Sequence, residues 1–472
     1  MTHNQKRRTI WTLAVTSVAL FMVSLDNLVV TTALPVIRHQ LHASISQLEW
    51  TVNAYTLTFA VLLLTGAALG DRFGRRRLFV AGLLLFTGAS AFAALATSAT
   101  MLDAARAAQG VGGAIVAPLT LTILSAGVPA ERRGLALGIW GGVGGLAVAL
   151  GPLVGGAVVD GVSWHWIFWL NVPIGLALAP LAWRRLDESR GDDSGLDLRG
   201  LALASAGLLG IVWGLVRGNA HGWTSAGIVA PLVAGALLVA AFVAWERRAP
   251  APMLPLRFFR GRTFTLANVA SLLMFFGMFG SIFLLAQFFQ TVQGLSPLAA
   301  GLRILPWTAM PMFVAPVAGA LSDRIGGERL MTAGLALQGA GLLWIAAVTS
   351  PGTPYAELVG PFMLSGAGMA LFFAPVANVV LGAVRPQEQG KASGATNAIR
   401  ELGGVFGVAA LASVFAHLGG YRSAQSFVHG TTTAVYVGGG VVLAAAVAAA
   451  LIPRTVRRAE APAAEAALAE AA

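Results

Sequence analysis

Fourteen apolar segments, each long enough to cross a lipid bilayer, constrain this chain more than any other feature of its sequence. They lie at about 10–34, 48–70, 78–98, 101–124, 134–159, 166–183, 200–216, 225–245, 264–286, 299–321, 330–348, 357–380, 397–417 and 432–452. Only helices and closed barrels satisfy every backbone hydrogen bond in hydrocarbon, and a spanning helix needs about 20 apolar residues. Charged residues are only 11% of the chain, too few to cover a water-facing surface. The sequence therefore predicts an all-α polytopic membrane protein.

Loop charges support this count of spans. If the N-terminus is cytoplasmic, all but six of the 31 Lys and Arg residues fall in cytoplasmic segments. Basic loops are typical of the cytoplasmic side of a membrane, and one span more or fewer would invert every later loop. We therefore expect 14 transmembrane helices with both termini in the cytoplasm. The net charge of +11 then reflects topology, and we expect no nucleic acid partner.

An internal repeat divides the chain into two halves. Residues 67–74 and 319–326 share the pattern Asp-Arg-x-Gly, and each follows an apolar span. Asp71 and Asp323 are further apart in the sequence than the length that six spans occupy. The excess is about the length of one helical hairpin with its connections. We expect an N-terminal six-helix bundle (1–183), a linker with an inserted transmembrane hairpin (184–262), a C-terminal six-helix bundle (263–455) and a low-complexity cytoplasmic tail (456–472).

Asp26 and Arg106 are the ionisable residues inside predicted spans of the first half that point most to a function. Placing a carboxylate in hydrocarbon costs free energy, so such a residue is usually functional. Asp26 is the only carboxylate that we expect deep in this half, and its position indicates a function such as reversible proton uptake. The alternative is that Asp26 is a structural residue that hydrogen-bonds to a neighbouring helix. Arg106 keeps its charge and needs acceptors, although its side chain could instead reach the outer interface. We predict a proton-exchanging site at Asp26 and Arg106.

A second ionisable pair, Arg400 and Glu401, lies in the thirteenth predicted span. We expect this pair to be mainly structural, neutralised by pairing with a neighbouring helix, and we treat both residues as secondary candidates for the site.

The fifth predicted span is rich in glycine. Its candidate residues are Gly138, Gly151, Pro152, Gly155 and Gly156. Small residues four positions apart allow helix backbones to approach closely, and Pro152 removes a backbone hydrogen bond and favours a bend. The span is therefore either a flexible element of the mechanism or a tightly packed element without moving parts.

A very short cytoplasmic loop joins the second and third predicted spans. Its charges and its glycine recur in the second half, and the set comprises Asp71, Arg72, Gly74, Arg75, Asp323, Arg324 and Gly326. These residues predict a conformational latch between cytoplasmic helix ends. The alternative is ordinary anchoring of basic loops at the membrane surface.

The composition also excludes several kinds of chemistry. Cys is absent, so the chain has no disulfide, Cys-based metal site or catalytic thiol. The seven His residues have no acid cluster beside them, and no hydrolase triad or phosphate-binding loop is visible. We expect neither an enzyme, nor a metal site, nor a cofactor.

Five motifs occur in a definite order along the chain. They are Leu25-Asp26 through Ala33-Leu34-Pro35, Ala67-x-Leu69-x-Asp71-Arg72-x-Gly74-Arg75-Arg76, Arg106-x-x-Gln109-Gly110, Gly151-Pro152-x-x-Gly155-Gly156 and Trp164-His165-Trp166 through Asn171-Val172-Pro173. Together, over about residues 10–455, they resemble the major facilitator superfamily, and specifically its fourteen-span drug:proton antiporters of the EmrB/QacA type.

The resemblance implies a fold of two parallel six-helix halves plus the hairpin. It implies proton-coupled efflux of drugs, antibiotics or other amphipathic small molecules by alternating access, with the proton gradient as energy source. It adds Gln109 and Gly110 as candidates near the proton site. A functional monomer in a bacterial plasma membrane is expected. A metabolite or lipid carrier or importer of the same fold, or a membrane sensor that does not transport, remain the alternatives.

Overall fold

The computed structural model describes residues 3–453, apart from 129, 191–196, 251, 253, 386 and 387 and some side chains within helices. In the described ranges all regular secondary structure is helical. The first part forms α1 (His3–Gln40), α2 (Ile45–Phe73), α3 (Arg75–Ala94), α4 (Ala99–Gly127), α5 (Ala130–Gly161), α6 (His165–Trp169) and α7 (Asn171–Arg185). The middle forms α8 (Leu198–His221), α9 (Ala226–Glu246) and the 3-10 helix η1 (Leu256–Arg260). The rest forms α10 (Arg262–Thr291), α11 (Pro297–Thr308), α12 (Met310–Ile325), α13 (Gly327–Val348), α14 (Tyr355–Gly382), α15 (Gln389–Leu418) and α16 (Ala424–Ala450).

Every predicted apolar segment overlaps at least one helix, and two of them are divided between consecutive helices, α6 with α7 and α11 with α12. Within the described ranges, 12 helices are long and apolar enough to cross a membrane. The number is 13 if the two parts of α2, which are bent by 50°, count as one span. The prediction of an all-α polytopic membrane protein is confirmed, and the count of fourteen stays a prediction.

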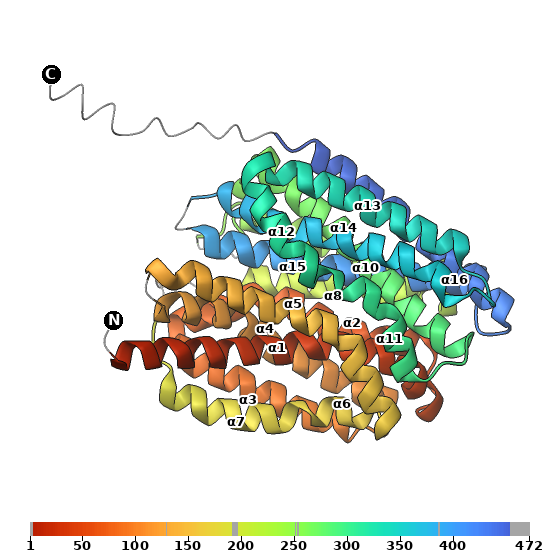
Figure 1. The fold of residues 1–472 in the computed structure, drawn as a ribbon, viewed down its shortest axis with the longest axis horizontal. Coiled ribbons are helices and arrows are strands. Elements are labelled where there is room, and N and C mark those ends of the chain that lie inside the picture. The colour runs from red at the N-terminus through yellow and green to blue at the C-terminus, as the bar shows by residue number, and fades with distance from the viewer. Residues whose placement is uncertain are drawn as a thin grey trace.

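The two halves repeat one packing scheme. In the first half, α1 packs on α5, while α2 and α3 pack on α4. In the second half, α10 packs on α15, while α12 and α13 pack on α14. Figure 1 shows the two groups, the red-to-yellow helices below and the green-to-blue helices above.

The repeated glycine has the same backbone role in both halves. Gly74 joins α2 to α3 with φ 107°, and Gly326 joins α12 to α13 with φ 94°. A side chain is strained at such positive φ values, so glycine allows the chain to reverse within one residue. The sequence repeat is therefore also a repeat of backbone conformation.

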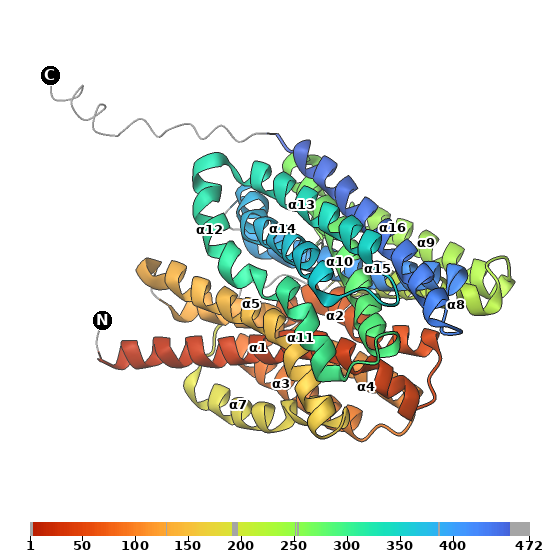
Figure 2. The same cartoon turned by 45° about the vertical axis from the view of Figure 1, so that its right-hand side comes forward.

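The halves meet through α5 against α11 and through α2 against α15. A Cβ atom at Gly301 would lie 2.2 Å from the carbonyl oxygen of Pro152, and one at Gly156 would lie 2.5 Å from that of Pro297. Gln290 on α10 also donates to the Thr32 carbonyl on α1 at 2.7 Å. These contacts lie toward the ends of α1 and α5 far from the N-terminus, where α5 and α11 run together (Figure 2).

The inserted hairpin packs on the seam between α2 and α15. Val212 of α8 is fully buried in an apolar cluster with Leu57 of α2 and Val405 of α15. Ser413 of α15 donates to the Leu215 carbonyl at 3.1 Å. One hairpin helix therefore contacts both halves.

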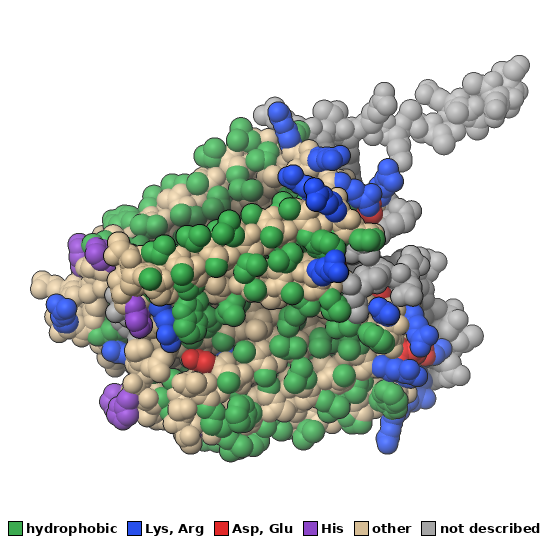
Figure 3. Space-filling view, turned by 180° about the vertical axis from the view of Figure 1, so that it is seen from behind, with side chains coloured by type: hydrophobic (Ala, Val, Ile, Leu, Met, Phe, Trp, Pro, Cys, Tyr) green, Lys and Arg blue, Asp and Glu red, His purple; other side chains and the backbone are tan. Residues whose placement is uncertain are grey.

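The surface divides into an apolar flank and charged ends. Figure 3 shows hydrophobic side chains across the middle of the molecule, most Lys and Arg side chains at one end and His side chains at the other. The start of α1 and the end of α16 lie on the same side (Figure 1). This distribution is typical of an even number of crossings with one basic face.

Candidate functional site

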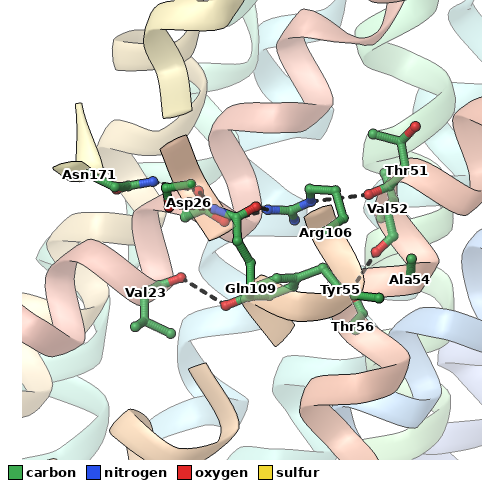
Figure 4. Close-up of polar contacts among 12 residues, drawn as sticks. Val23, Asp26, Thr51, Val52, Ala54, Tyr55, Thr56, Arg106, Gln109 and Asn171 are labelled. Carbon is green, nitrogen blue, oxygen red and sulfur yellow. Dashed lines mark hydrogen bonds and ion pairs between the residues drawn. The ribbon is translucent and has the colours of Figure 1, made fainter. Parts of the chain in front are cut away.

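Asp26 lies in the middle of α1 and is buried among polar side chains from two other helices (Figure 4). Its Oδ2 accepts a hydrogen bond from Arg106 Nη1 of α4 at 2.5 Å. Its Oδ1 accepts from Gln109 Nε2 at 3.2 Å and from Asn171 Nδ2 of α7 at 2.7 Å. The carboxylate is therefore held between α1, α4 and α7.

Arg106 is fully buried and has several partners besides Asp26. Its Nε donates to the Thr51 carbonyl of α2 at 3.2 Å, and Nη1 donates to Gln109 Oε1 at 3.0 Å. The guanidinium also lies 4.2 Å from the centre of the Tyr55 ring, a favourable position for a cation. In this conformation the side chain points into the bundle and does not reach the outer interface.

Close helix packing brings these groups together. Gly110 follows Gln109 on α4, and a Cβ atom there would lie 1.9 Å from Thr58 Oγ1 and 2.4 Å from the Tyr55 carbonyl. Thr58 Oγ1 donates to the Ala107 carbonyl at 3.0 Å, which joins α2 to α4. Gly110 is thus a packing residue that lets Arg106 reach the α2 backbone.

The network extends to residues that the sequence did not single out. Gln109 donates to Ser90 Oγ of α3 at 2.7 Å, and Tyr55 donates to the Val23 carbonyl at 3.3 Å. Thr51 Oγ1 donates to Asp103 Oδ1 at 2.9 Å. The only feature of the sequence that could have indicated these residues is that each is a polar residue within an apolar span. Such residues are too common to show which of them bind to Asp26 or Arg106.

The expectation that Asp26 is the only deep carboxylate of the first half is wrong. Glu49, in the first turns of α2, is also buried, at 3% exposed. It lies within electrostatic range of Tyr421, in the loop between α15 and α16. The hydropathy pattern placed Glu49 at the end of a predicted span, where a charged side chain is expected to reach water. It could not show that residues of the C-terminal half cover this end of the helix.

Arg400 and Glu401 lie on α15, outside the hydrogen bonds of the Asp26 network. Arg400 Nη1 donates to Asn397 Oδ1 at 3.4 Å, and its guanidinium lies near the rings of Phe275 and Phe373, at 5.8 and 5.7 Å from their centres. Glu401 lies within electrostatic range of Tyr55, and so it faces the first half. Among the described residues, Arg400 Nε and Glu401 Oε2 are buried without a hydrogen-bond partner.

The predicted latch residues between α2 and α3 contact one another and the segment after α7. Arg75 Nε donates to Asp71 Oδ1 at 2.7 Å, while Arg72 lies near the Phe73 ring. The backbone N–H of Arg75 donates to the Ser189 carbonyl at 2.9 Å.

Glu188 is the acid that faces this loop from the segment after α7. It accepts from the Arg76 N–H at 3.0 Å, and its carboxylate would lie 2.9 Å from a Cβ at Gly74. The bridge from this loop to the segment after α7 therefore uses Glu188, backbone groups and the side chains of Arg76 and Arg77, whose Nε atoms each lie 3.7 Å from Glu188. Gly326 shares the glycine geometry, and the side chains of Asp323 and Arg324 lie outside the described residues.

The glycine-rich part of α5 contacts two different helices. Cβ atoms at Gly151 and Gly155 would lie 2.6 Å from Leu28 Cβ and 2.3 Å from Thr32 Oγ1, both on α1. Pro152 and Gly156, one residue further on, face α11 of the other half, as described above. Gly138 lies in α5, with its surroundings outside what the structure describes, and α5 continues through Pro152 as one helix.

An apolar pocket of about 460 Å³ lies between the N-terminal part of α1 and α5. Its lining includes Ile10, Leu13, Phe21, Ile139 and Val143, with Ser17 as the polar member. Such a lining favours apolar groups of a ligand and provides few partners for a charged one.

The arrangement places one ionisable acid, Asp26, beside one permanent cation, Arg106. In the conformation observed, the negative charge of Asp26 and the positive charge of Arg106 cancel. A proton on Asp26 would end this pairing and change the charge of the centre. No group of three or more His, Asp or Glu side chains that could hold a metal ion occurs in the described part of the chain.

The fold and the site define a multi-pass helical membrane transporter made of two similarly packed halves. The chain belongs to the Major Facilitator Superfamily, whose family model matches residues 16–408 and 269–471. Multidrug resistance protein Stp of Mycobacterium tuberculosis is 36% identical over 87% of this chain and 76% of its own length.

Two further relatives have similar identities. The tetracenomycin C resistance and export protein of Streptomyces glaucescens is 34% identical over 86% of this chain and 76% of its own length. The multidrug efflux pump LfrA of Mycolicibacterium smegmatis is 34% identical over 93% of this chain and 88% of its own length.

Proposed function

We propose that this chain exports hydrophobic or amphipathic small molecules, such as drugs or antibiotics, from a bacterial cell in exchange for protons. The observation that carries the coupling is the buried ion pair of Asp26 with Arg106 on two helices of one half. The names of the relatives, which include multidrug efflux and antibiotic export proteins, support the substrate class. The apolar pocket between α1 and α5 suits the apolar part of such a substrate.

In the proposed cycle, Asp26 exchanges the proton and Arg106 controls when it does so. The loop residues Asp71 and Arg75 act as a cytoplasmic latch, and α5 moves or seals against α11. No cofactor takes part. Proton entry at about 150 mV supplies roughly 3.5 kcal/mol, enough for a solute gradient of roughly 300-fold per proton.

The proposed setting follows from the charge distribution. The chain crosses the plasma membrane fourteen times as a monomer, with both termini and the segment 184–199 in the cytoplasm. The N-terminal bundle (1–183), the linker and hairpin (184–262), the C-terminal bundle (263–455) and the tail (456–472) are its proposed units. The basic end of the surface in Figure 3 is then the cytoplasmic face.

Everted membrane vesicles test the proposal, because they take up an exported substrate from the outside medium. We expect a fluorescent cationic dye or an antibiotic to accumulate when the vesicle interior is acidified, and to leave again when a protonophore is added. Accumulation only with the opposite gradient would favour an importer. The absence of any gradient-dependent flux over a broad panel of compounds would favour a sensor.

A further inference from the structure

A second carboxylate lies one helical turn from Arg106 on the same helix. Asp103 is half-buried near the start of α4, three residues before Arg106, a spacing at which helical side chains are neighbours. Its Oδ1 accepts from the Thr51 hydroxyl at 2.9 Å, and the Thr51 carbonyl accepts from Arg106 Nε at 3.2 Å. Thr51 therefore connects Asp103 to the guanidinium.

Protonation of Asp26 creates an electrostatic problem at this centre. Arg106 is fully buried and stays charged, so it would lose its anion when Asp26 becomes neutral. Removing one partner of a buried ion pair is strongly destabilising, because it leaves an uncompensated charge. The other groups that touch the guanidinium, Gln109, Tyr55 and the Thr51 carbonyl, carry no net charge.

We infer that Asp103 is the alternative counter-ion of Arg106, positioned by Thr51 and used when Asp26 carries a proton. With Asp26 ionised, Arg106 pairs with it, and Thr51 holds Asp103. With Asp26 protonated, the guanidinium turns toward Asp103, so that Arg106 is paired in both states. This inference rests on the proposed function of Asp26 as the proton carrier.

Among the charged groups around this centre, Asp103 is the carboxylate on the same helix as Arg106 and linked to it through Thr51. On α1 the charged group facing Arg106 is Asp26 itself, and residues 78–98, which include most of α3, contain no ionisable side chain. On α2, Glu49 lies two residues before Thr51, a spacing that places the two side chains on different sides of the helix. Glu49 lies within electrostatic range of Tyr421. Asp103 itself lies within electrostatic range of Arg106. Glu401 on α15 lies within range of Tyr55, across the contact between halves.

A double-mutant cycle of thermal unfolding in detergent tests the counter-ion directly, without any transport measurement. Asp103→Asn alone should change the melting temperature little, because Asp26 still neutralises Arg106. Asp26→Asn should also be tolerated, because Asp103 takes over. The double variant should melt several °C lower than the sum of the two single effects, because the charge is then unpaired.

Asp160→Asn, an exposed acid at the end of α5, is the matched control and should combine additively with Asp26→Asn. Additive melting temperatures for the Asp26 and Asp103 variants would overturn the inference. If the double variant does not fold, the cycle is measured with Asp26→Asn and Thr51→Val instead, where Thr51→Ser should preserve the coupling.

The pH profile of transport gives the second test. Without Asp103, protonated Asp26 leaves Arg106 unpaired, so protonation requires a higher proton concentration. For Asp103→Asn we expect the midpoint of the profile to move to lower pH by about one unit, with the Asp160→Asn profile unchanged. An unchanged midpoint for Asp103→Asn would overturn the inference. If Asp26→Asn itself responds to pH like the wild type, the proposed function of Asp26 fails, and the unfolding cycle still decides whether Asp103 pairs with Arg106.

Discussion

At the scale of single residues, the site depends on which polar groups surround one buried charge. Asp26, Arg106 and Gln109 could be predicted because charged or motif residues in an apolar span need a reason to be there. Asn171 belongs to one of the motifs, yet nothing in the sequence assigned it to the site, where it makes a 2.7 Å hydrogen bond to Asp26. A neutral amide costs much less free energy in a membrane helix than a charged group does, so it can occur there without a function. The sequence also does not indicate which way its side chain faces.

Asn171 should adjust the proton affinity of the site. Its amide donates to the ionised form of Asp26, and a hydrogen bond to a charged group contributes roughly 1.5–3 kcal/mol. Replacement by Leu removes this stabilisation of the charged form, so protonation becomes easier. We expect the midpoint of the transport pH profile of Asn171→Leu to rise by about one unit.

The matched control for this experiment is Asn268→Leu, which removes a buried amide that bonds within α10 of the other half. Its profile should keep the wild-type midpoint. A downward shift for Asn171→Leu, or an equal shift in both variants, would contradict the assignment of Asn171 to the proton site.

At the scale of helices, the sequence predicted that the helices exist better than it predicted where they begin, end or break. Hydropathy marks the apolar stretch of a helix, whereas α1 begins seven residues earlier, at His3, among polar residues. The segment 299–321 reads as one span, yet α11 ends at Thr308 and α12 begins at Met310. Pro306 and Pro311 lack backbone N–H groups near this break, but proline also lies within unbroken helices, so the sequence alone did not locate the break.

The contact of α5 with α11 provides a prediction at this scale. Val at Gly156 would overlap the backbone of Pro297 and Leu298, so the two helices must separate. Spin labels on Cys residues introduced at Asp160 and Gln293 should report a distance that is several Å longer in Gly156→Val. We expect transport to fall at least tenfold, because the halves can no longer close at this end.

Gly161→Val is the control, since a Cβ atom there meets nothing within 4 Å. It should keep the wild-type distance and flux. If Gly156→Val also keeps both, the α5–α11 contact is packing without a mechanical role.

The loop between α2 and α3 provides a second prediction. Asp71 is partly exposed and pairs with Arg75 in its own loop, so its charge contributes less than about 1 kcal/mol to stability. Asp71→Asn should therefore insert, express and unfold nearly as the wild type does, while transport falls because the latch is lost. Full transport at wild-type expression would favour simple membrane anchoring, which requires only the Arg residues.

At the scale of the whole molecule, the halves are joined at the ends far from the N-terminus. The Arg38 guanidinium at the end of α1 lies 3.6 Å from the centre of the Tyr421 ring in the loop after α15. Tyr421 in turn donates to Gln287 of α10. Burial raises the pKa of Tyr421 to about 12, so the hydroxyl keeps its proton and this contact is insensitive to pH in the physiological range. Contacts of this kind join residues hundreds of positions apart, which no local pattern could reveal.

The topology is tested by labelling introduced Cys residues in a chain that has none of its own. With fourteen spans and a cytoplasmic N-terminus, Asp192→Cys lies inside and Thr97→Cys, in the exposed loop between α3 and α4, lies outside. A membrane-impermeant maleimide should modify Thr97→Cys in intact cells and Asp192→Cys only after lysis. Modification of Asp192→Cys from outside would refute the fourteen-span arrangement.

The central claim is that Asp26 couples substrate movement to protons, and substrate flux in proteoliposomes under an imposed pH gradient tests it most directly. Asn has nearly the shape of Asp and does not titrate. Asp26→Asn should therefore fail to accumulate substrate in response to the gradient while still exchanging labelled for unlabelled substrate. Asp160→Asn, which removes an exposed carboxylate, should accumulate substrate like the wild type. If Asp26→Asn responds to the gradient as the wild type does, the proton is carried elsewhere, and Glu401 is the next residue to test.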